Sequence, residues 1–399
     1  MQFELPPTAG LPINLGDLRN TKHYSLDTQI AQLLSIPLPA QTCSGTVAFI
    51  LSLQILQELQ PNKNQVIVPA WTCPLVVLAI EKIGLIPIIC DLAPNSLAFD
   101  LQQLKYAIHN QTLAIVATHF AGLVNSFKEI ELIAKQYNCY IIEDAAQSMG
   151  ALSKGQSVGL QGDIGFFSLA FGKGLTTAEG GLVFSKHPEI HQKLHQKAKQ
   201  LPTLKYWEIK RCLELIGYYF LYRPSCLPFI YGYSRRKALK RHDEISAVGD
   251  DFNLNDIPIH RLGSWRSQVA AQAAIRLPEQ WKQLRSQAKR RIKQLQNIPY
   301  LYVFTEDINS VGTFPFILLL VDNALRCEKI LAELWHSNLG VTKLFVRSIS
   351  HYPNLAHFNT RTTPHAEQFA ARSFTISNSL WMNDAKFEQI LNILKKYEY

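Results

Sequence analysis

The stretch GDIGFFSLAFGKGLTTAEGG, residues 162–181, is the most informative part of this sequence. It begins as a short apolar strand, continues into Gly172-Lys173-Gly174 and ends in an acidic-Gly-Gly turn, with Ser168 five residues before the lysine. A single lysine in a loop is usually a solvated surface charge. This lysine follows a strongly apolar segment, and partial burial would lower its pKa and leave a nucleophilic amine.

Apolar runs alternate with helix-like segments from about residue 40 to 190. Because the runs are short, continuous and rich in β-branched residues, they are typical of strands buried on both faces of a parallel sheet. The strands are expected at 65–69, 86–92, 113–120, 139–144 and 164–170, and the helices at 45–59, 74–84, 101–109 and 126–137. This alternation predicts an α/β fold with a mostly parallel sheet sandwiched by helices, which binds ligands beyond the carboxyl ends of its strands.

Two further loops place polar residues where such a sheet binds ligands. Ser44-Gly45-Thr46 opens the first helix, where free N–H groups and the helix dipole favour a phosphate. Serine and threonine also cap many helices that bind nothing. Asp144 ends the fourth strand, and a half-buried carboxylate there needs a positive partner. A protonated pyridine nitrogen or a structural arginine would both serve.

The composition limits the class of protein. Of 399 residues, 47% are apolar and 18% are charged, which excludes disordered, collagen-like and coiled-coil chains. The formal net charge of +9 suits anionic partners such as phosphates, nucleic acid or an acidic membrane surface. Seven widely spaced cysteines without a C-x-x-C pair indicate neither a disulfide framework nor a zinc site, so we expect no metal and a reducing, cytoplasmic compartment. We also expect no signal peptide and no membrane span.

The chain divides into three parts by composition. Residues 1–200 hold the alternating segments, and 261–399 hold a linking helix and a smaller α+β region with strands expected at 313–321 and 373–377 and helices at 324–338 and 383–397. Between them, 201–260 is an aromatic and basic insertion. The insertion either packs on the body or a dimer partner, or makes a peripheral membrane contact through 213–242, with aromatics in the interface and Lys/Arg on anionic headgroups. No nucleic-acid recognition module accompanies the basic run SRRKALKRH at 234–242, so we expect no nucleic-acid binding.

A reactive lysine, an acid and a phosphate cup together predict pyridoxal 5'-phosphate (PLP) as the cofactor. Lys173 would form the Schiff base with it, and Asp144 would keep its ring nitrogen protonated. Gln147, one helical turn beyond Asp144, is placed to reach its phenolic oxygen. The residues predicted to hold its phosphate are Ser44, Gly45, Thr46 and Ser168.

At this point the sequence resembles the sugar aminotransferases of the DegT/DnrJ/EryC1/StrS family, which have the fold-type-I aspartate aminotransferase fold. The shared elements are S-G-T (44–46), V-P-A-W-T-C (68–73), H-F-A-G (119–122), E-D-A-A-Q (143–147), G-D-I-G-F-F-S (162–168), G-K-G-L-T-T-A-E-G-G (172–181) and H-Y-P-N-L (351–355). Their order and spacing match over about residues 35–200 and more loosely over 260–397.

The resemblance implies a homodimeric, PLP-dependent aminotransferase that passes an amino group from glutamate to a keto sugar, usually nucleotide-linked, in surface polysaccharide or glycolipid synthesis. It also implies that Lys173 is the Schiff-base lysine, that Asp144 and Gln147 contact the cofactor ring, and that Ser168 binds the phosphate. Related dehydratases carry histidine at the lysine position, so the lysine implies transamination.

Two departures from the family pattern affect the site. Many relatives place an aromatic side chain over the cofactor ring two residues beyond Trp71; here that position is Cys73, so either Cys73 packs on the ring or Trp71 swings in. Relatives often carry a G-x-N-x-R loop that reaches the neighbouring subunit's phosphate. The best local match is 262–266, where Ser264 replaces the asparagine and Arg266 is retained as a candidate substrate contact.

Three other residues are candidate substrate contacts with structural alternatives. His119 ends a strand and either orients substrate or fills a polar core position. His351 and Tyr352 either contact substrate from the smaller region or form a turn at Pro353.

Two alternative functions also remain: a membrane-associated aminotransferase with a lipid-linked acceptor, and a non-enzymatic regulator that kept the fold.

Overall fold

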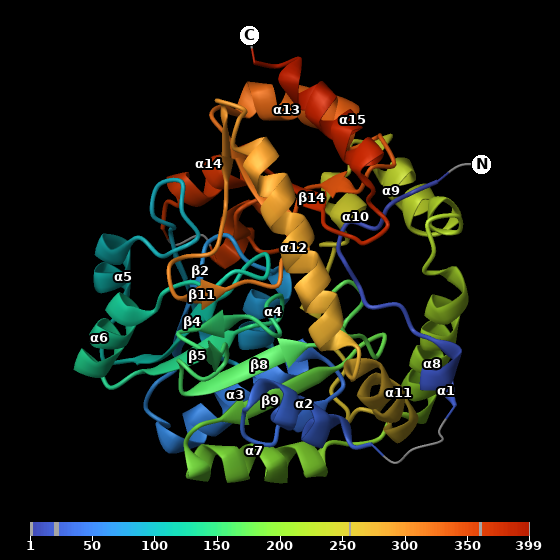
Figure 1. The fold of residues 1–399 in the computed structure, drawn as a ribbon. Coiled ribbons are helices and arrows are strands. Elements are labelled where there is room, and N and C mark those ends of the chain that lie inside the picture. The colour runs from blue at the N-terminus through green and yellow to red at the C-terminus, as the bar shows by residue number, and fades with distance from the viewer. Residues whose placement is uncertain (1–2, 20–23, 255–256, 359–360, 399) are drawn as a thin grey trace.

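A seven-stranded sheet forms the centre of the computed structural model, which describes residues 3–19, 24–254, 257–358 and 361–398 (Figure 1). The strand order is β1-β9-β8-β5-β4-β2-β3. The bounds are β1 (Ala40–Thr42), β2 (Gln65–Pro69), β3 (Ile86–Cys90), β4 (Thr112–Thr118), β5 (Tyr140–Asp144), β8 (Ile164–Ser168) and β9 (Gly181–Ser185). Strand β9 is antiparallel to both of its neighbours and the other pairs are parallel, which confirms the α/β fold with a mostly parallel sheet.

Helices cover both faces of this sheet because alternate side chains of each strand point to opposite sides. Val66 and Val68 of β2 belong to the core that holds α3 (Gly45–Leu59) and α4 (Pro74–Lys82). Ile67 between them belongs to a separate core. The helices over that second core are α5 (Leu101–Ala107) and α6 (Lys128–Gln136), and α7 (Pro188–Gln200) packs with α3 on β9.

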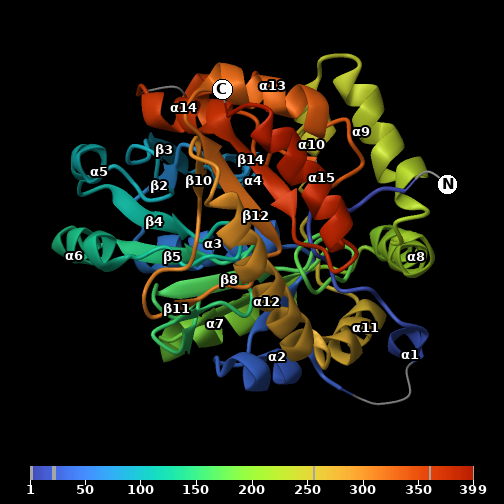
Figure 2. The same ribbon diagram turned by 45° about the horizontal axis from the view of Figure 1, so that its top comes forward.

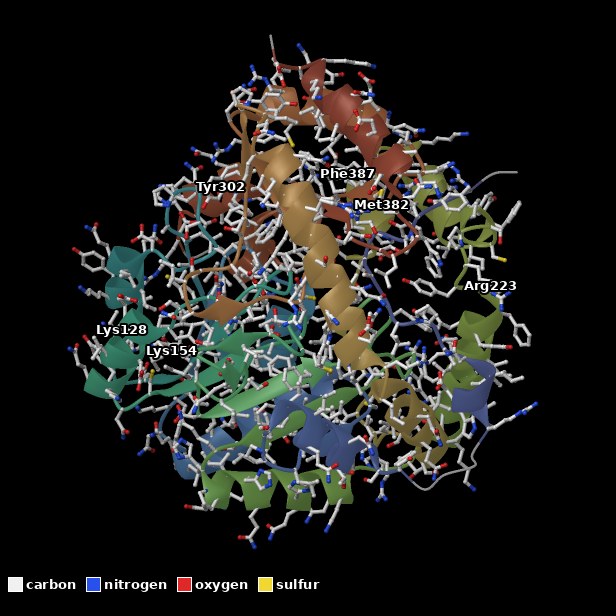
Figure 3. All side chains as sticks on the ribbon, in the orientation of Figure 1. Lys128, Lys154, Arg223, Tyr302, Met382 and Phe387 are labelled. Carbon is white, nitrogen blue, oxygen red and sulfur yellow. The ribbon has the colours of Figure 1, made fainter. Side chains whose placement is uncertain are left out.

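A smaller antiparallel sheet carries the C-terminal part of the chain, in the order β10-β12-β14-β13. Helix α12 (Leu277–Leu295) runs from the larger sheet to this one across the front of the molecule (Figures 1 and 2). Arg291 of α12 donates to the carbonyl of Met382 and lies 5.1 Å from the centre of the Phe387 ring (Figure 3). The elements here are β10 (Leu301–Val303), β12 (Phe316–Val321), α13 (Ala324–Leu334), β13 (Val341–Thr342), η3 (Ile349–His351), η4 (Ala356–Phe358), α14 (Pro364–Arg372), β14 (Ser373–Ser377) and α15 (Asp384–Lys395).

Most residues between 205 and 248 are helical, and they line one edge of the molecule (Figure 1). Their elements are α8 (Lys205–Leu221), η1 (Leu227–Phe229), α9 (Tyr231–Leu239) and α10 (Glu244–Val248). The N-terminal segment runs along them, because the Glu4 N–H donates to the carbonyl of Pro224 at 2.9 Å. Two arginines of the basic run are bound inside the protein: Arg235 and Arg236 lie 2.8 and 2.9 Å from the buried carboxylate of Glu4. The expectation that the whole run meets anionic headgroups is therefore wrong for these two residues.

The remaining described elements complete the larger half and its connections. They are α1 (Leu15–Leu18), α2 (Leu26–Leu34), α11 (Ser264–Ala274) and a small sheet of β6 (Leu152–Ser153), β7 (Gln156–Ser157) and β11 (Ser310–Val311). All seven cysteines are free thiols. Among the helices in the described ranges, none combines the length and the apolar character needed to cross a membrane.

Replacing Glu4 by glutamine tests how the N-terminal segment is held. Because Arg235 is only 2% exposed, the Glu4→Gln variant leaves a buried guanidinium without its counter-charge. We expect the free energy of unfolding to fall by about 3 kcal/mol in a chemical denaturation experiment. Glu58→Gln is the control, because Glu58 forms a half-exposed pair with Lys197 and its loss should cost no more than about 1 kcal/mol. Equal effects of the two substitutions would contradict the prediction.

Candidate active site

The carboxyl ends of three neighbouring strands bring the central polar residues together. In the parallel register Thr118 of β4 lies beside Asp144 of β5, and Asp144 lies beside Phe166 of β8. His119 follows β4 directly and Ser168 ends β8, so both lie at the same edge of the sheet as Asp144. The sequence analysis expected this convergence because parallel strands end on one side.

The N-terminus of α3 lies against the end of β8. Ser44 is the N-cap of α3 and caps the helix with its side chain, because its Oγ accepts the N–H of Val47 at 3.1 Å. A Cβ placed on Gly45 would lie 3.0 Å from the Ser168 Cβ, so any side chain here would push Ser168 away by a few tenths of an ångström. With the half-buried Thr46 in the first turn, hydroxyls and free helix N–H groups share one small cup.

Lys173 lies in the loop between β8 and β9. Gly172 and Gly174 have φ values of +78° and +84°, a left-handed conformation that L side chains rarely adopt. The two glycines allow the chain to turn twice within three residues and leave Lys173 half-buried beside the strand ends. Its positive charge acts on Asp144 and opposes the effect of burial on the pKa of that carboxyl group.

Asp144 is a buried carboxyl group with little local compensation. Burial raises its pKa, while the N–H of Ala146, at 3.0 Å from Oδ1, and the charge of Lys173 act in the opposite direction. The net result is a pKa above the ordinary value of an aspartate. A cationic group bound against Asp144 would therefore be strongly favoured.

Gln147 and Cys73 complete the surroundings of Lys173. The Oε1 atom of Gln147 accepts the N–H of Ala121 at 3.1 Å, and the side chain lines the same cavity as Lys173. Cys73 is the N-cap of α4 and is partly exposed. Burial, and next the charge of Asp250, raise the pKa of the Cys73 thiol to about 12, so this side chain is a neutral thiol.

The chain matches the family model described as the DegT/DnrJ/EryC1/StrS aminotransferase family over residues 19–217, about half of its length. The chain belongs to this family. Strand β5 with Asp144, the Lys173 loop and the start of α3 all lie inside the matched region.

Individual relatives cover different shares of the DegT/DnrJ/EryC1/StrS protein described here. Protein MosB of Rhizobium meliloti is 37% identical over 163 residues, 41% of this chain and 32% of MosB. GDP-perosamine synthase of Vibrio cholerae is 28% identical over 202 residues, 50% of this chain and 53% of that enzyme. The chain thus spans between a third and about half of these curated relatives. The solved structure of Spr1654 from Streptococcus pneumoniae in its PMP form superposes with a TM-score of 0.76 at 16% identity, covering 99% of this chain and 98% of that one, which shows a shared fold.

The structure does not bring Trp71 to the site of this family member. The indole is fully buried and its Nε1 donates to the carbonyl of Phe345 at 3.2 Å. Its ring packs against Phe120, Phe345 and Phe369 with centroids 5.3, 5.1 and 4.7 Å away. Trp71 is therefore a core residue, and of the two side chains considered for the cofactor ring Cys73 is the one that is partly exposed.

His119 fills a polar core position and does not line the site. It is fully buried and stacks on Phe127, and its Nδ1 accepts the N–H of Asn125 at 3.0 Å. This bond leaves the ring proton on Nε2, which lies 2.7 Å from the carboxylate of Glu143. Of the two alternatives for His119, the structure therefore favours the polar core position, because both ring nitrogens are occupied inside the protein.

Arg266 is also a structural residue. Its side chain is fully buried, and the guanidinium donates to the carbonyls of Thr177 and Glu179 and to the carboxylate of Glu208. The expected substrate contact by Arg266 is therefore wrong within this chain. The residue fixes the turn that follows Lys173 to helix α8.

His351 and Tyr352 are neighbours in the sequence but differ in burial. His351 is half-exposed and contacts Ser348, so the structure does not bring it to Lys173. Tyr352 is buried and its hydroxyl donates to the carboxylate of Asp250 at 2.8 Å. The charge of Lys173 is among the causes that lower the pKa of Asp250, so Tyr352 is bound to a carboxyl group that the charge of Lys173 reaches.

Asp250 is the residue that the sequence analysis missed. It ends the helical insertion, next to the exposed Asp251, and no pattern in the sequence distinguishes the two aspartates. Only the path of the insertion over the body of the protein buries one of them and brings it to the hydroxyl of Tyr352.

The titration of Asp250 predicts a pH dependence of stability. Burial raises its pKa from 3.8 to about 7, although the Tyr352 hydroxyl and the charge of Lys173 act against this shift. Between these pH values the folded protein holds a proton that the unfolded chain has released, so the free energy of unfolding falls as the pH rises. At about 1.4 kcal/mol per pKa unit, we expect wild type to lose a few kcal/mol relative to Asp250→Asn over this range in urea denaturation.

The matched control for this experiment is Asp251→Asn, which removes an exposed carboxylate one residue away. Its stability should follow the wild-type pH dependence closely. If the Asp250→Asn variant and wild type lost stability in parallel between these pH values, Asp250 would not be a buried proton-binding group.

Proposed function

We propose that this protein is a PLP-dependent aminotransferase that transfers an amino group, with glutamate as the donor, to a nucleotide-linked keto sugar. The observation that carries the proposal is the position of Lys173, held by two left-handed glycines beside the buried Asp144 at the carboxyl end of the sheet. Family membership supports it, as does the PLP form in which Spr1654 has been solved. The name of GDP-perosamine synthase supports a nucleotide-linked sugar.

The residues present fit the cofactor. The cup formed by Ser44, Gly45, Thr46 and Ser168 offers hydroxyls and helix N–H groups to a phosphate, and Gly45 keeps that cup open against Ser168. The carboxylate of Asp144 suits a protonated ring nitrogen, because its burial makes a cationic partner favourable. Lys173 would carry the cofactor covalently, with Gln147 at its phenolic oxygen and Cys73 against its ring.

In this mechanism the site residues of the chain hold the cofactor in place or transfer a proton. PLP supplies the electron sink that stabilises negative charge on the carbon bearing the amino group. Asp144 would keep the ring nitrogen protonated. Lys173 Nζ would act as general base and then as general acid: it would take the proton from that carbon and deliver it to the cofactor in the same half-reaction, and the second half would run this proton transfer in reverse. In the net reaction glutamate gives its amino group and becomes 2-oxoglutarate, and the sugar's carbonyl oxygen is replaced by that amino group.

We also propose that the protein is a cytoplasmic homodimer. Each chain would consist of three units, 1–200, 201–260 and 261–399, and the segment 213–242 would make a peripheral membrane contact. Exposed aromatic side chains support the membrane contact: Phe220, Phe229 and Tyr233 are 57, 72 and 63% exposed. The exposed Lys237 and Lys240 lie on the same segment. Aromatic rings with neighbouring lysines are typical of interfacial contacts on anionic lipid.

Substituting Lys173 by alanine tests the proposed reaction. Wild-type protein incubated with PLP should show a visible absorption band, and glutamate should convert that band. The Lys173→Ala variant should lose covalent attachment, measured by borohydride reduction and mass spectrometry, and should lose the glutamate reaction essentially completely.

The matched control is Lys128→Ala, which removes an exposed lysine at the start of α6 (Figure 3). It should leave the band and the glutamate reaction unchanged. Absence of a visible band in wild type after addition of PLP would contradict the proposed cofactor, and attachment in Lys173→Ala would move the covalent site elsewhere.

Flotation with vesicles tests the membrane contact. Wild type should float with vesicles that contain anionic lipid, and the Phe220→Ser/Phe229→Ser variant should float several-fold less because it loses two exposed rings. Tyr106→Ser removes an 81% exposed ring on α5 and serves as the control. No flotation of wild type, or equal flotation of all three proteins, would exclude contact through this segment.

A further inference from the structure

A second cavity is distinct from the one that Lys173 lines. It has a volume of about 490 Å³, which falls within the usual range of small-molecule sites, and it shares no lining residue with the first cavity. One face of α13, the turn between α9 and α10, and the segment after β13 form its walls. Helices α9, α10 and α13 lie in the upper part of Figure 2. We call this space, between Leu331 of α13, His242 and Lys343, the α13 cavity.

Lys343 is the most buried charged group of the α13 cavity. Its side chain is only 10% exposed. The nearest carboxylate, that of Glu244, lies 3.7 Å from its Nζ, which is beyond hydrogen-bond distance. An ammonium group has three N–H donors, and burying it is costly unless those donors are bonded. Lys343 is therefore a nearly buried cation that lacks a hydrogen-bond acceptor within the described ranges.

Trp335, which also lines the α13 cavity, is a second donor without an acceptor. Its side chain is 3% exposed, and its Nε1–H finds no hydrogen-bond partner in the part of the chain that the structure describes. Buried donors in native proteins are nearly always bonded, so two unbonded donors at one cavity are unusual. The inner wall of the α13 cavity thus has donors for which the protein supplies no acceptor.

The carboxylates at the α13 cavity lie toward solvent. Glu244 is 44% exposed, and Glu328 is exposed as well. Water therefore solvates both carboxylates at the rim, whereas the ammonium group of Lys343 is inside. Arg347 is exposed at the same rim, and its planar guanidinium can bind two oxygens of one anion. Burial thus separates the charges so that the interior of the cavity favours an anion.

The end of the basic run 234–242 adjoins the α13 cavity. The two arginines of the run that bind Glu4 are used inside the protein. In contrast, Lys240, Arg241 and His242 are exposed, and His242 lines the cavity. Exposed charges of one sign raise the local concentration of ions of the opposite sign. The exposed end of the basic run would therefore attract anions to the mouth of this cavity.

We propose that the α13 cavity binds the phosphate group of an organic phosphate, with Lys343 inside the cavity and Arg347 at its rim as the cationic ligands. A phosphate brings negative charge and several acceptor oxygens, which these donors lack. The remainder of the ligand would lie on Leu239 and Leu331, which line the same cavity. This site is separate from Lys173, so it leaves the nucleotide-linked acceptor of the proposed reaction unaffected.

The phosphate belongs either to a soluble ester or to a lipid headgroup. The second source is open because exposed aromatic rings of the proposed membrane contact lie on the same helical insertion as His242. Both sources present the same phosphate monoester to Lys343 and Arg347, so one set of variants serves to test both.

Titration with glycerol 3-phosphate, followed by calorimetry on PLP-loaded protein, tests the soluble source. Wild type should bind it, and Lys343→Gln should weaken binding at least about tenfold because it removes the buried charge. Ala332→Phe fills the cavity from the exposed side of α13 without changing a charge and should weaken binding similarly. Lys329→Gln removes an exposed lysine of α13 that does not line the cavity, and this control should bind as wild type does.

Flotation with vesicles tests the lipid source. Phosphatidic acid carries a phosphate monoester, whereas phosphatidylglycerol carries a phosphodiester and shows what negative charge alone contributes. If the ligand is a lipid, wild type should float with phosphatidic acid vesicles more than with phosphatidylglycerol vesicles. This preference should be lost in Lys343→Gln and kept in Lys329→Gln.

The proposal is overturned if wild type binds neither glycerol 3-phosphate nor phosphatidic acid, or if Lys343→Gln and Ala332→Phe bind both as wild type does. None of these readouts requires catalysis, so such a result leaves the aminotransferase proposal intact. Conversely, protein that does not take up PLP contradicts the aminotransferase proposal, while the difference between wild type and Lys343→Gln still reports on the α13 cavity.

Discussion

The buried guanidinium of Arg266 is the interaction on which the arrangement of the site depends. It binds two carbonyls of the turn after Lys173 and the carboxylate of Glu208 on α8, so three distant segments share one charge. A buried charge is tolerated only when its hydrogen bonds are satisfied, and breaking one side of such a cluster is costly. Because of this constraint, the lysine loop and helix α8 are placed together, and the cavity wall stands beside the reactive amine.

The site combines two surroundings that differ in polarity. At the strand ends, Asp144, Ser168 and the start of α3 offer charge and hydrogen bonds suited to a phosphorylated cationic ring. A short distance along the same loop, Phe171 begins the stacked aromatic wall of the cavity. Lys173 lines this cavity, so a cofactor held on it would face both surroundings.

Sequence reasoning succeeded where structure is local. Helix 45–59 and strand 65–69 match α3 and β2 residue for residue, because apolar runs of β-branched residues and a capped helix leave few alternatives. It left alternatives open for His119 and Trp71 and expected a substrate contact for Arg266. The structure buries all three side chains fully with partners from remote segments. Asp250 shows the converse, because burial beside Lys173 gave it a role that no motif marked.

The sequence by itself determined the fold class and the convergence of the strand ends, and it predicted which lysine, which acid and which phosphate cup would form the site. These features depend on periodicity, strand order and glycines that act over a few residues. Only the tertiary structure decided which polar residues face the site and what the insertion does there. Burial and partner choice depend on contacts between segments hundreds of residues apart, such as Glu4 with Arg235 or Gly10 with Tyr222, and no local pattern encodes them.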